Sequence, residues 1–114
     1  NHALDATGGG LWTNTTHYRV TVPAGKRYWL YGGYCSRDNA ATMKAFIYNA
    51  AGAYLMQLAD WAAAAGGCHY PETANVGNIV FPIPLDATDY LELVFNVAQG
   101  ANAYATAIML EVDV

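Results

Sequence analysis

The chain contains 114 residues, of which 54% are hydrophobic and 12% are charged, and its formal net charge is −4. A chain of this length forms one domain with its own core, and its composition excludes intrinsic disorder, which combines low hydrophobicity with high net charge. The acidic balance and the lack of a basic patch argue against nucleic-acid binding, and no apolar run approaches the ~20 residues of a membrane-spanning helix.

Charged side chains are scarce for a domain of this size, with nine acidic and five basic residues. Either neutral polar residues form much of the surface, or another chain covers part of it. We expect the second arrangement.

Residues 1–16 show no hydrophobic period and are rich in Gly, Thr and Asn, with three consecutive glycines at 8–10. We predict an extended N-terminal arm over 1–16 and a single domain over 17–114. An arm of this kind suits contact with a neighbouring chain, although frayed chain ends are also common.

The segment that follows alternates apolar and polar residues, as strands with one buried face do. Strands are predicted over 17–22, 26–35 and 41–49, with a turn at 23–25 and a polar loop at 36–40 between them. In the first strand the residues on the apolar side are Tyr18, Val20 and Val22.

The strand over 26–35 carries large side chains on both sides. Tyr28 and Leu30 lie on one side, and Trp29 and Tyr31 lie on the other. A strand with one side in the core and the other in an interface has this pattern, as does one whose second side is a tyrosine-rich solvated surface. The glycine pair at 32–33 indicates a bulge or a close approach of two backbones.

The hairpin turn "NAAG" over 49–52 leads into a strand over 53–61, and the Ala-rich and Gly-rich stretch over 62–78 is predicted to be a long connection. The two prolines of "IVFPIPL" indicate an edge strand or an irregular extended segment. After the turn "DATD", the chain ends with strands over 90–97 and 103–114, which are separated by "AQGAN".

These last two strands also have an inward and an outward side. We expect Glu92 and Glu111 to be solvated charges on the outward sides. The expected inward residues are Leu91, Leu93, Phe95 and Val97 in the first strand, and Tyr104, Ile108, Leu110 and Val112 in the second.

The chain therefore reads as seven or eight short strands without a convincing helical repeat. This pattern predicts an all-β fold, an antiparallel β-sandwich for which a jelly roll is one candidate form.

Two cysteines, Cys35 and Cys68, are candidates for one disulfide. Closing a loop of roughly 34 residues would stabilise the fold by about 3–4 kcal/mol in the chain-entropy model. The alternative is a pair of buried, reduced thiols that act as small apolar residues. The wide spacing of the two cysteines, without a CxxC motif, is not typical of a metal site.

No motif for catalysis is present. The only serine, Ser36, lies beside Cys35 and Arg37, and the three histidines are His2, His17 and His69. Because no arrangement of nucleophile, base and acid is apparent, we predict no catalytic, cofactor-binding or metal-binding residue and no enzyme activity.

The aromatic residues are the strongest functional signal, with nine tyrosines and three tryptophans. Flat rings exposed on a β-sandwich can stack on sugars, and the same rings suit contact with another subunit. The candidate contact residues are Trp12, Trp29, Tyr31 and Trp61.

Three stretches, "VPAGKRYWLYGG", "RDNAATMKAFIYNAAGAYLMQLA" and "PLDATDYLELVFNVAQGANAYATAIMLEV", resemble small β-sandwich virion proteins of tailed bacteriophages in their rhythm and turn placement. The resemblance covers most of residues 20–112. It implies a structural protein at the virion surface, either a head-decoration (cement) protein or a part of a tail or fibre.

The resemblance also implies partners, namely further copies of the chain, for which a trimer is one candidate form, and a major capsid or other virion protein. A disulfide would be a departure, because phage particles assemble in a reducing cytoplasm. Two alternatives stay open: a carbohydrate-binding module, and a subunit of a non-viral extracellular filament joined by strand or arm exchange.

Overall fold

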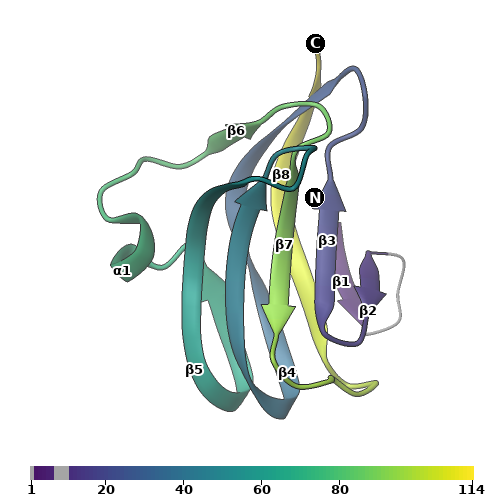
Figure 1. Cartoon of the computed structure of the whole chain (residues 1–114), viewed down its shortest axis with the longest axis vertical. Coiled ribbons are helices and arrows are strands. Elements are labelled where there is room, and N and C mark those ends of the chain that lie inside the picture. The colour runs from purple at the N-terminus through teal and green to yellow at the C-terminus, as the bar shows by residue number, and fades with distance from the viewer. Residues whose placement is uncertain (1, 7–10) are drawn as a thin grey trace.

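A computed structural model describes residues 2–6 and 11–114, with side chains described from residue 11 onward. Eight strands and one short helix make up this part of the chain (Figure 1). Their bounds are β1 (His2–Ala6), β2 (Trp12–Asn14), β3 (His17–Thr21), β4 (Lys26–Tyr48), β5 (Tyr54–Tyr70), α1 (Thr73–Val76), β6 (Ile83–Leu85), β7 (Tyr90–Phe95) and β8 (Tyr104–Asp113). The predicted all-β fold is confirmed.

β4 organises the sheet, because its two halves pair with different strands. Residues 26–36 of β4 pair with β8, residues 28–30 pair with β6, and residues 43–48 pair with β7. β5 pairs along β4 from Gly33 to Tyr48 and so follows it through both halves. All these pairings are antiparallel, and the strand order is β1-β8-β4-β7-β3-β2, with β5 and β6 also beside β4.

The result is one continuous sheet that folds over at the bend of β4 and β5 and encloses the core between two layers (Figure 1). One layer contains β1, β8 and the first half of β4, and the other contains β2, β3, β7 and the second half of β4. This order is compatible with a jelly roll. The predicted sandwich and its jelly-roll form both stay predictions, because the described strands form a single sheet that is not closed.

The sequence prediction was wrong at the bend, where residues 36–40 and 62–70 lie within β4 and β5 instead of in loops. Arg37 is 4% exposed and is enclosed by the bend. Its Nη1 donates hydrogen bonds to the carbonyl oxygens of Ala41 at 2.7 Å and Ala62 at 2.9 Å, and its Nε donates to that of Gly66 at 3.3 Å. The short side chains of residues 62–67 allow β5 to follow the corner, and Gly66 takes a φ of 93° that favours glycine.

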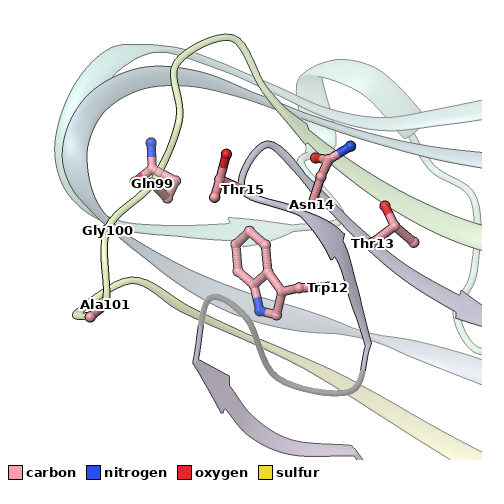
Figure 2. Close-up of a pocket in the computed structure, with 7 residues that line it drawn as sticks. All are labelled: Trp12, Thr13, Asn14, Thr15, Gln99, Gly100 and Ala101. Atoms are coloured by element: carbon pink, nitrogen blue, oxygen red, sulfur yellow. The ribbon is translucent and has the colours of Figure 1, made fainter.

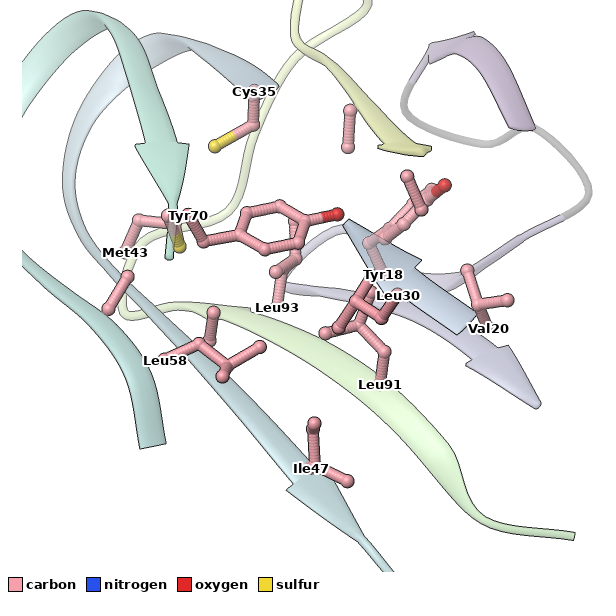
Figure 3. Close-up of a cluster of buried hydrophobic side chains, with 14 of the residues drawn as sticks. Tyr18, Val20, Leu30, Cys35, Met43, Ile47, Leu58, Tyr70, Leu91 and Leu93 are labelled. Carbon is pink, nitrogen blue, oxygen red and sulfur yellow. The ribbon is translucent and has the colours of Figure 1, made fainter. Parts of the chain in front are cut away.

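The core lies between the layers (Figure 3). The inward residues predicted for β3 are confirmed, since Tyr18 is 0% exposed and Val20 and Val22 are each 1% exposed. In β7 the predicted inward residues Leu91, Leu93 and Phe95 are buried as well, whereas Val97 lies beyond the end of the strand and is exposed. The predicted close approach at residues 32–33 is also confirmed, because a Cβ atom on either glycine would overlap Tyr70.

The prediction for β8 was wrong about which side of the strand faces the core. Ala105, Ala107 and Met109 point into the core, while Ile108 and Leu110 are 49% and 52% exposed. The Tyr70 hydroxyl donates a hydrogen bond to the Thr106 carbonyl at 2.6 Å, so its ring occupies the space beside this part of β8. Small residues therefore fit inward there, and the larger ones point outward. The remaining residues predicted inward, Tyr104 and Val112, are half-buried.

The described parts of the predicted arm belong to the sheet. β1 pairs with β8, and β2 pairs with β3. The glycine run at 8–10 lies outside the described residues, and the arm's predicted contact with a neighbour stays a prediction.

Replacing Arg37 by Met should destabilise the fold strongly. The change removes the donor for three carbonyl groups at the bend. A buried carbonyl group without a donor costs about 1–3 kcal/mol, so we expect the free energy of unfolding to fall by roughly 3–5 kcal/mol. Chemical denaturation would measure the loss. Arg27→Met is the matched control, because Arg27 is partly exposed and pairs with Asp86 at 3.0 Å; its loss should stay under about 1 kcal/mol. Equal losses would show that the bend does not depend on Arg37.

Candidate functional site

The outer side of the first layer carries a row of large uncharged side chains, which we call the β4–β8 face. Its members are Trp29, Tyr31 and Tyr34 of β4 and Tyr104, Ile108 and Leu110 of β8. The strand register brings the two sets together, since Trp29 is paired with Leu110, Gly32 with Ile108 and Ser36 with Tyr104. A bulge between Leu30 and Gly32 shifts the register, so that Tyr31 and Tyr34 both point outward.

The β4–β8 face is open to solvent in the single chain. Tyr31 is 49% exposed, Tyr34 is 43% exposed and Leu110 is 52% exposed. Tyr34 and Tyr104 lie side by side with ring centroids 6.1 Å apart, and Tyr104 raises the pKa of Tyr34, so this phenol stays neutral at pH 7.

Charged groups near this face gather at one end of the strands. The pairs there are Lys26 with Asp113 and Arg27 with Asp86, and Glu111 lies beside them. The middle of the face therefore offers aromatic and aliphatic surface with hydroxyl tips, which can pack against another apolar surface without burying a charge.

The outer side of the other layer carries an aromatic cluster, formed by Phe46, Tyr48, Tyr54 and Tyr90. Tyr48 and Tyr90 stack with centroids 5.1 Å apart, and Tyr54 is 59% exposed. Burial, followed by the nearby Glu92 carboxylate, raises the pKa of Tyr48.

An ion pair borders the aromatic cluster. The guanidinium of Arg19 lies 4.3 Å from the centre of the Tyr90 ring, and its Nη2 lies 2.6 Å from a carboxylate oxygen of Glu92. The prediction that Glu92 is a solvated charge was wrong, because its side chain is only 8% exposed. Glu92 is on the outward side of β7 as expected, but its ion pair with Arg19 covers it. Glu111 is exposed, as predicted, but it lies on the same side of β8 as the buried Met109, near the end of the strand, and not on the outward side.

A pocket of about 400 Å³ opens between the β2–β3 turn and the loop before β8 (Figure 2). Its lining consists of Trp12, Thr13, Asn14, Thr15, Gln99, Gly100 and Ala101. These residues offer hydrogen-bonding groups and one indole, and none of them is titratable near neutral pH. The Gln99 amide is buried and bonds to backbone groups of Asp38, Asn39 and Val97, so it holds the loop in place.

The structure separates the four predicted contact residues. Trp29 and Tyr31 lie on the β4–β8 face. Trp12 is 7% exposed, and its ring stacks on Phe95 with centroids 5.5 Å apart, so it belongs to the core and to the pocket wall. Trp61 packs against the core, and its Nε1 donates to the His69 carbonyl at 2.8 Å.

Several candidate residues were missed by sequence reasoning. Ile108 and Leu110 were predicted to be buried, and the aromatic cluster combines rings from the β4–β5 hairpin with Tyr90 of β7, which is distant in the sequence. The local signals for the cluster were the alternation in β4, which places Phe46 and Tyr48 on the same side, and the turn at 49–52, which brings Tyr54 opposite Tyr48.

Cys35 and Cys68 are free thiols in this structure, and both are buried. Across the described residues, no three His, Cys, Asp or Glu side chains lie close enough together to hold a metal ion. No helix in this part of the chain has the length and hydrophobicity needed to cross a membrane.

Comparisons with known proteins give no relative: no protein-family model, no curated protein and no solved structure matches the chain.

Asp38 should make the loop beside the pocket sensitive to acid. Its carboxylate accepts hydrogen bonds from the backbone N–H groups of Gly100 at 2.7 Å and Asn102 at 3.1 Å, which hold the pKa of Asp38 below its usual value. Because the folded-state pKa lies below the unfolded value of about 3.9, this stabilisation is complete above that pH and is lost as the pH falls through the folded-state pKa.

Asp38→Asn should therefore lower the thermal unfolding midpoint at pH 7, and the gap to the wild type should shrink below about pH 4. Thermal scans at a series of pH values would measure this. Asp60→Asn, which alters an exposed carboxylate on β5, controls for the loss of one negative charge. A gap that stays constant with pH would contradict the role of Asp38.

Proposed function

We propose that the chain is a non-enzymatic structural subunit of a virus particle, a capsid decoration (cement) protein or other virion surface protein that acts through subunit packing. The observation that carries this proposal is the exposed, uncharged β4–β8 face, on which Tyr31, Ile108 and Leu110 are each about half exposed. The virion setting rests on the sequence resemblance alone.

An apolar face of this kind favours burial against another chain. Covering apolar surface is favourable by about 25 cal/mol per Å², and contiguous exposed patches on small proteins mark interaction sites. Tyrosine and tryptophan suit such sites because they bury area and keep a polar tip.

The partner proposed for the β4–β8 face is a second copy of the chain. Identical chains of net charge −4 repel each other overall, but the charged residues lie at the end of this face and not in its middle. Two copies can therefore pack face to face without placing like charges in contact. In the particle, the resulting dimer would bind a major capsid or other virion protein, and repeated weak contacts would add up over the lattice. A trimer, the other candidate form, would need a contact between two different surfaces of neighbouring copies.

Carbohydrate binding is the second candidate function, and the aromatic cluster on the opposite side favours it. Tyr54 offers an open ring, and the partly exposed Arg19 guanidinium beside Tyr90 offers hydrogen-bond donors. A sugar stacked on a ring with charged groups at its edge would fit such a surface. Trp29 and Tyr31 remain candidates for the same role on the β4–β8 face, whereas the rings of Trp12 and Trp61 are largely covered.

The third alternative, a filament joined by strand exchange, would use the first strand. β1 pairs with β8 at the edge of the sheet, so β1 of one copy could replace that of the next. No contact of the described residues favours this arrangement over packing through the β4–β8 face.

Leu110→Glu should weaken self-association, because it places a charge on the β4–β8 face at the position paired with Trp29. We expect the dissociation constant to rise at least about tenfold, while the free energy of unfolding changes by less than about 0.5 kcal/mol. Light scattering on a size-exclusion column at several concentrations would measure association. Leu55→Glu is a matched control, since Leu55 is 53% exposed and lies on β5, away from this face. A wild-type chain that stays monomeric at high concentration would contradict the second-copy partner.

Tyr54→Ala should abolish carbohydrate binding if the aromatic cluster binds sugars, since stacking on the most exposed ring would be lost. Calorimetric titration with a panel of soluble polysaccharides would measure binding. Tyr31→Ala is the control on the other layer, because Tyr31 is 49% exposed and lies in the first half of β4, whereas the cluster lies on the second half. Binding that depends on Tyr31 instead would place the sugar on the β4–β8 face, and no binding to any member of the panel would count against this function.

A further inference from the structure

Cys35 and Cys68 face each other inside the fold. They occupy directly paired positions on β4 and β5, and they are 0% and 2% exposed. The Sγ of Cys68 lies 3.7 Å from the carbonyl oxygen of Cys35, and the two thiols are within hydrogen-bonding reach of each other. Figure 3 shows Cys35 among the core side chains, near Tyr70.

The strand register places the two residues at a separation that a disulfide can span. Directly opposite residues of an antiparallel pair have Cα atoms about 4.5–5.5 Å apart, and disulfides join Cα atoms about 4.4–6.8 Å apart. The flanking pairs, Tyr34 with His69 and Ser36 with Gly67, keep the same register. Rotation of the two side chains is therefore enough to bring the sulfurs together.

The surroundings of the pair favour one thiol as the nucleophile. The hydrogen bond with Cys35 lowers the pKa of Cys68, and the buried guanidinium of Arg37 lowers it further, against the effect of burial. The same hydrogen bond, together with burial, raises the pKa of Cys35. Because the thiolate is the reactive form, Cys68 would attack first and Cys35 would resolve the intermediate.

We propose that Cys35 and Cys68 are a thiol–disulfide site, which forms a cross-strand disulfide in the folded chain when it meets a small two-electron oxidant, either a low-molecular-weight disulfide or a diazene. With a disulfide, the Cys68 thiolate bonds to one sulfur and displaces the other as a thiolate. Cys35 then loses its proton, bonds to the Cys68 sulfur and displaces the second small thiolate. The two protein thiols together lose two electrons and two protons, and the small disulfide becomes two thiols. With a diazene, the Cys68 thiolate adds to one nitrogen of the N=N bond, Cys35 then bonds to the Cys68 sulfur and displaces that nitrogen, and the diazene becomes a hydrazine.

The bond would fasten β4 to β5 next to the bend held by Arg37. It would close a loop of roughly 34 residues, which constrains the unfolded chain and stabilises the fold. This inference does not depend on the proposed function. For a particle subunit it would mean assembly with free thiols in a reducing compartment, and bond formation after release.

The test is to treat the reduced, folded full-length chain with diamide, a diazene, and to follow its intact mass and its peptides under non-reducing conditions. We expect the mass to fall by two hydrogen atoms, one linked peptide pair that contains Cys35 and Cys68, and a rate that does not depend on protein concentration. The thermal unfolding midpoint should rise by roughly 10 °C and return after a thiol reductant is added.

Cys35→Ala and Cys68→Ala are the controls, and neither should lose hydrogen mass or gain stability with diamide. The wild-type mass alone decides the question if either variant fails to fold. An unchanged mass in the folded chain, a bond only between chains, or a bond that forms only in denaturant would overturn the proposal. A bond that forms without a rise in the unfolding midpoint would overturn its stabilising role.

Discussion

The bend of β4 and β5 depends on hydrogen bonds from one buried guanidinium. Where two paired strands turn from one layer to the other, the ladder between them is interrupted, as the register shift between Arg37 and Ala41 shows. Buried carbonyl groups at such a bend would be costly without a hydrogen-bond donor. Arginine can serve several of them at once because its donors lie in a fixed planar fork. Its charge is balanced here by carbonyl dipoles from both strands.

Because the sheet folds over at this bend, the molecule presents two outer sides of different chemistry. The side formed by the first half of β4 and by β8 is uncharged along its middle and carries Tyr31, Ile108 and Leu110. The side formed by the second half of β4 and by β7 carries the Arg19–Glu92 pair next to stacked tyrosines. The first side suits contact with protein and the second offers polar anchors, which is why the two candidate functions map to opposite layers.

The sequence predicted which residues face the core where one side of a strand is clearly polar, and it failed to do so where both sides are apolar. In β3 and β7 the buried residues were predicted correctly. In β8 both sides are apolar, so the choice depends on how much room the core leaves, and Tyr70 fills that room from another strand. The bend could not be predicted either, because residues 36–40 are polar like a loop and Arg37 finds its partners only in the folded chain.

Because β4 and β5 both run through the two layers, the layers share these two strands. Opening one layer would pull the same strands out of the other, so the layers cannot melt one after the other as separate units. Amide hydrogens in both halves of β4 should therefore exchange with solvent at a common slow rate set by global unfolding. The fold-over thus makes a domain of this size a single cooperative unit.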